Sequence, residues 1–326
     1  MAIVNWEIIL KLMTKKGKTP KIAVLGYGSQ GRSVALNLRD SGYEVIIGLP
    51  PKSKSRKKAR ADKFAAVISI SEAAKVSTTL CFAFPDHLQG KAYKSEIEAN
   101  LKDNSTLWFL HGFAVHFGFI KPAPHCDVIL IAPHAPGLAV RDEYLNNKSL
   151  SAFFAVHQNA TGKAGKTIFE LSGAMGFKKS KLVKTTFRDE ALGDLFGEQA
   201  VLCGGLAGLI KNGFEVLVEN GIPPENAYLE VAFQLDLIIA LVKKYGIEGM
   251  FERISVAARF GSLEAGPEIV GESVKKKMRS RYREIESGKF ARKLNNLSQA
   301  ELNSLSKELE KLSSPLFEKM ARKFSN

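Results

Sequence analysis

A glycine-rich turn near the start of the chain has the spacing of a dinucleotide-binding site. Residues 26–31 read Gly-Tyr-Gly-Ser-Gln-Gly and match G-x-G-x-x-G, directly after the apolar run 21–26 and before a helical pattern. In such a turn Gly26 permits the tight bend, Gly28 lets backbone N–H groups approach a pyrophosphate, and Gly31 allows close packing of the helix. The helix N-terminus adds partial positive charge. The expected cofactor contacts are Gly26, Tyr27, Gly28, Ser29, Gln30 and Gly31.

The loop after the second apolar run favours NADP(H) over NAD(H). A NAD-specific site normally has Asp or Glu at the end of the second strand, but here the run 43–48 continues as Leu-Pro-Pro-Lys-Ser-Lys-Ser-Arg-Lys-Lys. Serine hydroxyls and ammonium groups suit a 2′-phosphate. A solvated basic loop is the simpler alternative, but the position directly after the strand favours a cofactor contact. We therefore expect Lys52, Ser53 and Ser55 to bind the cofactor.

Two pairs of oxygen-bearing side chains have the spacing of a helical metal site. Asp194 and Glu198 lie at i and i+4, and Glu230 and Gln234 repeat this spacing on the next predicted helix. Like charges at this spacing repel, and Mg²⁺, which prefers hard oxygen ligands, would compensate for them. Acidic pairs are also common on exposed helices that bind nothing, so the pattern alone leaves both interpretations open.

The elements that must position these residues fall into two regions. Helical patterns alternate with apolar runs in the first half, which predicts a doubly wound parallel α/β sheet, and from about Thr185 the spacing is helical throughout. We therefore predict a NADP-binding Rossmann domain at residues 1–182 and an all-helical domain at residues 183–326. The expected strands cover 21–26, 43–48, 67–70, 79–83, 106–110, 128–132 and 153–156.

The charge of the chain predicts an anionic partner. The 326 residues carry a formal net charge of +14, and 45% of them are hydrophobic, which excludes a largely disordered chain. Residues 1–182 hold 26 Lys and Arg against 13 Asp and Glu, so nearly all of the excess lies in the predicted Rossmann domain. A phosphorylated cofactor fits this location. Nucleic acid is not expected, because the basic run 275–279 is flanked by Glu and lacks interleaved aromatic residues.

The remaining composition favours a cytoplasmic enzyme. The three cysteines are widely spaced, which fits neither a disulfide framework nor a zinc site. We expect no secretory signal and no membrane partner, since no apolar run approaches the ~20 residues of a membrane span.

Together these segments resemble ketol-acid reductoisomerase, the acetohydroxyacid isomeroreductase of branched-chain amino-acid synthesis, in its short (class I) form. The likeness runs from about residue 20 to 295 and is most specific in the stretch 194–205, Asp-Leu-Phe-Gly-Glu-Gln-Ala-Val-Leu-Cys-Gly-Gly. The resemblance implies a Rossmann domain followed by a knotted helical domain through which the chain forms a homodimer or higher homo-oligomer. It also implies a reaction: Mg²⁺-dependent alkyl migration in a 2-acetolactate-type keto acid, then NADPH reduction to a 2,3-dihydroxy acid.

The resemblance also assigns roles to individual residues. It implies that Asp194 bridges two Mg²⁺ ions, that Glu198 binds one of them, and that Glu230 binds the other. Ser255 would hydrogen-bond the substrate carboxylate, and His111 occupies the position of the active-site histidine. Asp86, Gln89 and Gly137 would line the NADPH site.

The chain departs from the family pattern at two of these positions. Gln234 stands where the family has a second Glu, so one metal ligand carries no charge. His134 stands where the family has Lys, so a permanent cation becomes an imidazole that is mostly neutral at pH 7. Three hypotheses therefore remain: a working reductoisomerase, a divergent paralogue that only reduces another 2-keto acid, and a catalytically dead NADPH-binding regulatory or scaffold protein. In the first, His111, His134 and Glu230 are the catalytic candidates.

Overall fold

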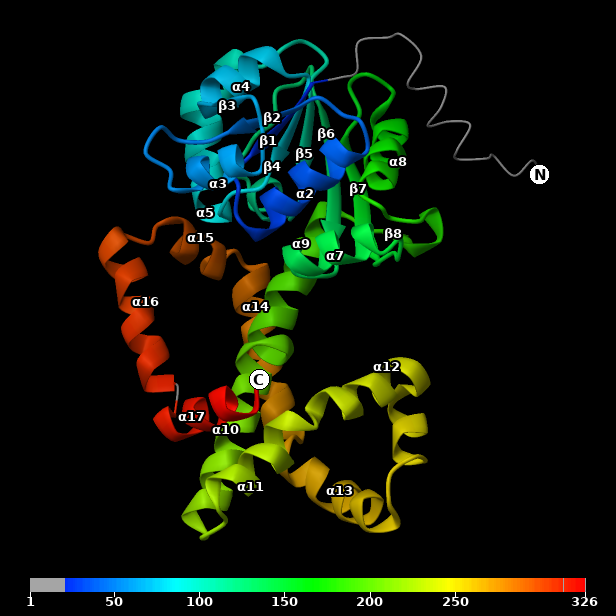
Figure 1. Cartoon of the computed structure of the whole chain (residues 1–326), viewed down its shortest axis with the longest axis vertical. Helices are drawn as coiled ribbons and strands as arrows, with labels where there is room; N and C mark the ends of the chain where they lie inside the picture. Colours follow the sequence, from blue (N-terminus) through cyan, green and yellow to red (C-terminus); the bar gives the residue numbers. More distant parts are fainter. Residues whose placement is uncertain (1–20, 313, 326) are drawn as a thin grey trace, which may run out of the picture. The chain divides into compact units, whose positions relative to one another are not determined.

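The computed structural model describes residues 21–312 and 314–325, which divide into two compact units (Figure 1). The first unit ends at Ala191 and the second begins at Leu192. The predicted boundary after residue 182 falls in a strand of the first unit. Each unit is described separately below.

The first unit contains an eight-stranded sheet in the order β3-β2-β1-β4-β5-β6-β7-β8. Neighbouring strands are parallel except for β6 and β7, which are antiparallel. The doubly wound parallel sheet is thus confirmed, with one antiparallel pair and a short last strand that the sequence did not predict. The strands are β1 (Ile22–Leu25), β2 (Val45–Gly48), β3 (Val67–Ile68), β4 (Thr79–Phe82), β5 (Thr106–Phe109), β6 (Asp127–Pro133), β7 (Ala152–Gln158) and β8 (Leu182–Lys184).

Helices cover both faces of this sheet because successive strand residues point to opposite sides. Val24 packs on the face covered by α2 and α8, whereas Leu25 packs on the opposite face, covered by α4 and α6. The helices of this unit are α2 (Ser29–Asp40), α3 (Ser55–Ala61), α4 (Ile70–Val76), α5 (Asp86–Ala92), α6 (Phe113–His116), α7 (Gly137–Leu145) and α8 (Ala164–Ala174), with the π-helical turn η1 (Tyr93–Ile97) and the 3₁₀ turns η2 (Glu98–Asn100) and η3 (Lys179–Lys181).

The second unit is helical throughout its described residues, as predicted. Phe214, Ala227 and Met320 form its buried cluster, against which Tyr228 and Phe317 pack. The helix α9 (Phe187–Gly197) leads into it from the first unit. It is followed by η4 (Glu198–Leu202), α10 (Gly204–Glu219), α11 (Pro224–Tyr228), η5 (Leu229–Phe233), α12 (Leu235–Phe251), α13 (Val256–Ile269), α14 (Glu272–Glu286), α15 (Lys289–Asn295), α16 (Gln299–Leu312) and α17 (Pro315–Phe324).

One helical run corrects an expectation from the sequence. The continuous stretch Phe187–Glu219 has 33 residues and is long and apolar enough to cross a membrane, by length and composition alone. Only 6% of its most apolar window is buried in the single chain. No long uninterrupted apolar run is visible in the sequence, because Lys211, Asn212 and Glu215 break up the apolar residues of this helix.

Candidate active site

The predicted cofactor residues gather at one edge of the sheet. Strands β1, β2, β4, β5 and β6 run parallel, so the segments that follow them emerge at the same edge. The strand order reverses between β1 and β4, and open α/β sheets bind ligands at such a switch point. The glycine-rich turn follows β1, the basic loop follows β2, and His111 and His134 follow β5 and β6.

The glycine-rich turn has the backbone geometry of a phosphate cradle. Gly26 adopts φ 101°, and a Cβ there would lie 2.3 Å from the carbonyl oxygen of Ala83. A Cβ at Gly31 would lie 2.6 Å from the carbonyl oxygen of Gly26, whereas one at Gly28 would meet no atom within 4 Å. The first turn of α2 carries no acidic residue, and its N–H groups have no partner within the helix. The turn is therefore closed on the protein side and open at Gly28, as a pyrophosphate requires.

The loop after β6 packs directly on this turn. The Nε2 of Gln30 donates to the carbonyl oxygen of Ala135 at 2.8 Å. A Cβ at Gly137 would lie 2.3 Å from the carbonyl oxygen of Ser29, so only glycine allows this backbone approach. His134 is exposed in the same loop, and its Nδ1 lies 3.0 Å from the Oγ of Ser151. The structure thus brings Gln30, Gly137 and His134 together.

A second group joins the ends of β4 and β5. The Nδ1 of His111 lies 3.3 Å from Oδ2 of Asp86. The buried Gln89 donates from Nε2 to the other Asp86 oxygen at 3.1 Å and to the carbonyl oxygen of Phe84 at 2.9 Å. Gln89 therefore braces the loop that carries Asp86, and Asp86 in turn orients the imidazole of His111.

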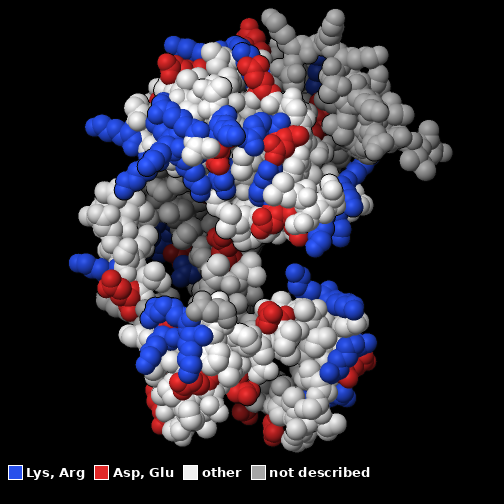
Figure 2. Space-filling view, viewed as in Figure 1, with Lys and Arg blue, Asp and Glu red and all other residues white. Residues whose placement is uncertain are grey.

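The basic loop is only partly available to a ligand. The guanidinium of Arg56 donates to the carbonyl oxygens of Leu49, Val67 and Ile68, so it ties together the ends of β2 and β3. Lys52 and Lys54 are exposed, and the Oγ of Ser53 accepts a hydrogen bond from the backbone N–H of Ser55 at 3.3 Å. Figure 2 shows Lys and Arg side chains gathered over the part of the first unit where α3 lies.

The predicted metal ligands lie at π-helical turns of the second unit. Glu198 opens η4, one turn after Asp194, and Glu230 lies within η5. Such turns recur at functional sites, because the extra residue redirects side chains. Gln234 donates from Nε2 to Oε2 of Glu230 at 2.9 Å and to its carbonyl oxygen at 3.1 Å. All four side chains are exposed, and their oxygen atoms are the donors that Mg²⁺ prefers.

The two pairs do not form one metal cluster within a single chain. In the described part of the chain, no three His, Cys, Asp or Glu side chains lie close enough together to hold a metal ion.

Ser255 caps a helix of the second unit. It precedes α13, and its Oγ accepts a hydrogen bond from the backbone N–H of Ala258 at 3.1 Å. A hydroxyl can accept and donate at once, so its proton can still be given to a ligand.

One buried carboxylate beside His111 was not singled out from the sequence. Glu190 is only 4% exposed, and its Oε2 accepts a hydrogen bond from the backbone N–H of Gly112 at 2.5 Å. A Cβ at Gly112 would lie 2.3 Å from the carbonyl oxygen of Phe187, so the first turn of α9 packs directly on this loop. The signal was present, because Glu190 extends the spacing of Asp194 and Glu198 by one more turn.

Comparisons with known proteins identify the family of this chain. Residues 16–181 match the family described as acetohydroxy acid isomeroreductase, NADPH-binding domain, and residues 187–325 match the ketol-acid reductoisomerase C-terminal domain. A ketol-acid reductoisomerase (NADP(+)) of Pyrobaculum arsenaticum is 44% identical over 90% of this chain and 88% of its own length. One of Caldivirga maquilingensis is 43% identical over 96% of this chain and 94% of its own.

A solved structure is similar over the same range. The NADH-preferring ketol-acid reductoisomerase from an uncultured archean aligns with a TM-score of 0.88 and 38% identity, over 94% of each chain.

Proposed function

The chain belongs to the ketol-acid reductoisomerase family, and from that premise we propose that it catalyses both steps of the family reaction. The substrate is a 2-hydroxy-2-alkyl-3-keto acid such as 2-acetolactate, and the product is a 2,3-dihydroxy acid of valine and isoleucine biosynthesis. The observation that carries the proposal is the edge of the sheet, where the phosphate cradle, the Asp86–His111 pair and His134 follow neighbouring strands. The two family matches together cover nearly the whole chain and do not favour the reductase-only or catalytically dead alternatives.

The matching family model and the curated relatives are described with NADPH or NADP(+), and we propose NADP(H) as the cofactor of this chain. The open cradle at Gly28 and the first turn of α2 would hold the pyrophosphate. Lys52, Ser53 and Ser55 would hold the 2′-phosphate. When bound, NADPH supplies the hydride for the reduction.

The exposed carboxylates fit Mg²⁺ by the chemistry of their oxygen atoms. Asp194 and Glu198 would hold the ions from one helix, and Glu230 with Gln234 would contribute from another. Because these pairs do not meet in one described chain, we propose that Glu230 and Gln234 complete the site of a second copy. When bound, Mg²⁺ would polarise the ketone of the substrate and stabilise the negative charge of the alkoxide.

The chain's own side chains bind and orient the substrate. Ser255 would donate its Oγ–H to the substrate carboxylate, since its oxygen is already used as an acceptor within α13. Asp86 holds His111 from the Nδ1 side, which fixes the ring for proton transfer. Glu230 would take up a proton at its carboxylate, with the amide of Gln234 as its neighbour. His134 is placed at the cofactor edge, where the family has a lysine.

We propose a homodimer or higher homo-oligomer, in which a second copy would cover the apolar surface of the second unit. Exposed apolar patches larger than a few hundred Å² mark interaction sites in soluble proteins. The long helical run Phe187–Glu219 would be covered by a second copy rather than by lipid, and no nucleic acid or membrane is needed. The exposed apolar residues of the second unit include Leu202, Leu209, Val216, Phe233, Leu237, Ile247, Val256, Phe260, Leu263 and Ile269.

We propose a cytoplasmic location for the protein.

A paired assay tests the proposed function. NADPH oxidation is measured with 2-acetolactate and with 3-hydroxy-3-methyl-2-ketobutyrate, the keto acid formed by the alkyl migration, with and without Mg²⁺. Turnover of both compounds supports the complete reaction. Turnover of the second compound alone contradicts it and indicates a reductase without isomerase activity.

A further inference from the structure

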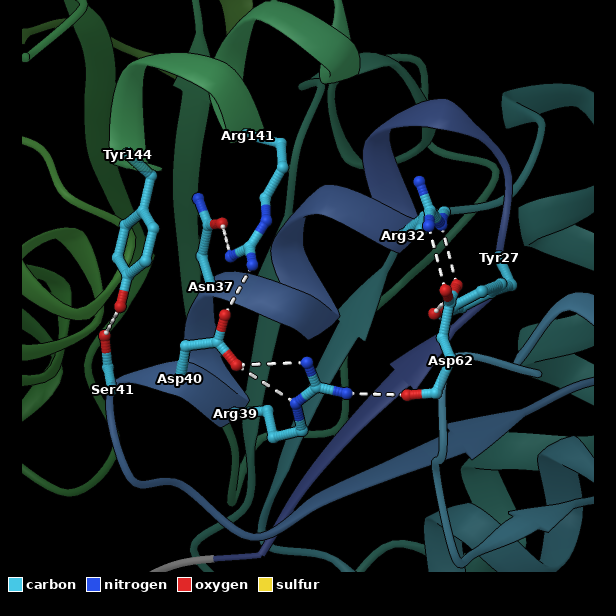
Figure 3. A network of polar contacts seen from close by, with 9 residues as sticks. All are labelled: Tyr27, Arg32, Asn37, Arg39, Asp40, Ser41, Asp62, Arg141 and Tyr144. Atoms are coloured by element: carbon cyan, nitrogen blue, oxygen red, sulfur yellow. Dashed lines mark hydrogen bonds and ion pairs between the residues drawn. The ribbon is translucent and has the colours of Figure 1, made fainter. Parts of the chain in front are cut away.

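A single aspartate links the glycine-rich turn to the basic segment that follows β2. The carboxylate of Asp62 accepts the hydroxyl of Tyr27 at 2.9 Å, and it accepts the guanidinium of Arg32 at 2.7 and 2.8 Å (Figure 3). Tyr27 belongs to the turn itself, and Arg32 lies in the first turns of α2. Asp62 is the C-cap residue that directly follows α3. Three hydrogen bonds therefore converge on one side chain between two parts of the proposed cofactor site.

The backbone at Asp62 is held in place as well. Its carbonyl oxygen accepts Nη1 of Arg39, from the far end of α2, at 2.6 Å. The guanidinium of Arg39 lies over the ring of Phe64, and Tyr27 meets the same ring edge-on at a centroid distance of 5.7 Å. Lys63 adopts φ 65°, so the chain turns sharply directly after Asp62. The segment 62–64 is thus fixed to both ends of α2.

The network is charged and partly enclosed, and its protonation state is fixed at neutral pH. The side chains of Asp62 and Arg32 are 17% and 31% exposed, and Tyr27 is 3% exposed. The guanidinium of Arg32 holds the pKa of Asp62 below its usual range, and burial raises the pKa of Tyr27. The carboxylate stays ionised and the hydroxyl stays protonated, so the three groups form a fixed brace.

We propose that Asp62 is a positioning residue for NADPH, which sets the distance between the pyrophosphate turn and the segment that carries Ser53 and Ser55. This inference rests on the proposed function. Asp62 acts on the cofactor indirectly. Its hydrogen bonds to Tyr27 and Arg32 hold the pyrophosphate turn, and its place directly after α3 holds the helix that begins at Ser55. The Arg32–Asp62 pair has no net charge, so it does not attract the 2′-phosphate. It contributes to NADPH selectivity through the distance that it sets between the pyrophosphate turn and the segment of Ser53 and Ser55. NADH has no 2′-phosphate, so its binding depends less on that spacing.

A charge-conserving double variant tests this assignment. The double variant Arg32→Gln, Asp62→Asn removes one positive and one negative charge, so the net charge of the site is unchanged. Fluorescence titration is expected to show NADPH bound about tenfold more weakly, the size of a lost charged hydrogen bond. NADH binding is expected to change by less than about threefold, and kcat at saturating NADPH by less than about twofold. Tyr27→Phe removes only one hydroxyl and is expected to weaken NADPH binding by about threefold, even if the double variant folds poorly.

Asp103→Asn is the matched control, because Asp103 is exposed and precedes β5 at the opposite edge of the sheet. Equal weakening of NADPH and NADH with a lower Tm would indicate general loss of packing and overturn the assignment. Unchanged NADPH affinity in both variants would also overturn it. Tighter NADPH binding by Asp62→Asn alone would make Arg32 a 2′-phosphate ligand instead. Failure of the wild-type chain to bind NADPH would overturn the proposed function itself, and this inference with it.

Discussion

The Nδ1 of His111 lies 3.3 Å from Oδ2 of Asp86, although the two residues follow different strands of the sheet. The pair forms because β4 and β5 are adjacent, parallel and in register from Thr79 with Thr106 to Phe82 with Phe109. The loops after both strands therefore emerge side by side. A carboxylate at Nδ1 fixes the ring and favours the form that carries a proton on that nitrogen.

Asp86→Asn is expected to lower kcat/KM about 10- to 100-fold, because the imidazole of His111 loses the carboxylate that orients it. The variant retains an oxygen that can accept from Gln89, so its Tm is expected to stay near that of the wild type. Steady-state kinetics and thermal unfolding check both statements. An activity equal to that of the Asp103→Asn control would show that the pair plays no part in catalysis.

Two glycines of the turn are expected to respond oppositely to alanine. Gly26→Ala places a Cβ 2.3 Å from the Ala83 carbonyl oxygen at a positive φ, and we expect it to lower the free energy of unfolding by about 2–4 kcal/mol. Gly28→Ala meets no protein atom within 4 Å, so the fold should tolerate it while NADPH binding weakens. Denaturant unfolding and NADPH titration separate the two effects. Unchanged NADPH affinity in Gly28→Ala would show that no pyrophosphate approaches there.

Gln234→Glu is expected to strengthen Mg²⁺ binding. The change replaces an amide that donates to Glu230 with a second carboxylate, which repels Glu230 until a cation is present. The Mg²⁺ concentration for half-maximal activity should fall about three- to tenfold, and metal-free stability should drop slightly. Gln299→Glu, at the start of α16, is the control. A second substitution, His134→Lys, should raise Mg²⁺-dependent activity further. If neither substitution raises it, these two positions have no role in the use of Mg²⁺.

Phe260→Glu is expected to weaken self-association. Phe260 is 71% exposed on α13 of the single chain, and a charge buried in an interface loses its hydration. Light scattering across a dilution series should show the dissociation constant raised about 100-fold, with a parallel loss of Mg²⁺-dependent turnover. Leu145→Glu, at an apolar side chain that is 59% exposed in the first unit, should leave the assembly intact. A wild-type chain that is monomeric and fully active would contradict the shared metal site.

Arg32→Gln is expected to change the pH dependence of stability. Arg32 lowers the pKa of Asp62 in the folded chain, so this pair contributes stability above the unfolded pKa of about 4, and the contribution is lost as the pH falls through the folded pKa. The variant should therefore lose more stability at pH 7 than at pH 3. Urea unfolding at the two pH values measures the difference, and an equal loss at both would contradict the ionised brace.

Local patterns in the sequence were sufficient for most of the fold. Each expected strand exists, because short apolar runs bounded by turn residues mark buried strands in the local sequence. The antiparallel placement of β7 and the three-residue β8 depend on pairing across the sheet, which no local pattern carries. The knotted path of the helical domain stays a prediction.

The candidate site likewise combines features that the local sequence predicts with contacts between residues that are distant in sequence. The glycine turn could be predicted because its glycine spacing directly follows a strand and precedes a helix, all within a short stretch of sequence. The link from Tyr27 to Asp62 spans 35 residues and the bond from Gly112 to Glu190 spans 78, so both arise only when the sheet is assembled. The roles of Asp194, Glu198, Glu230 and Ser255 stay predictions until metal and substrate are bound.

The most direct test of the central claim is product identification by mass spectrometry, with 2-acetolactate supplied to the purified full-length chain. We predict a 2,3-dihydroxy acid that forms only when NADPH and Mg²⁺ are both present, in an amount equal to the NADPH oxidised. If the chain binds NADPH but forms no dihydroxy acid, or forms the dihydroxy acid without Mg²⁺, the proposed reaction is wrong.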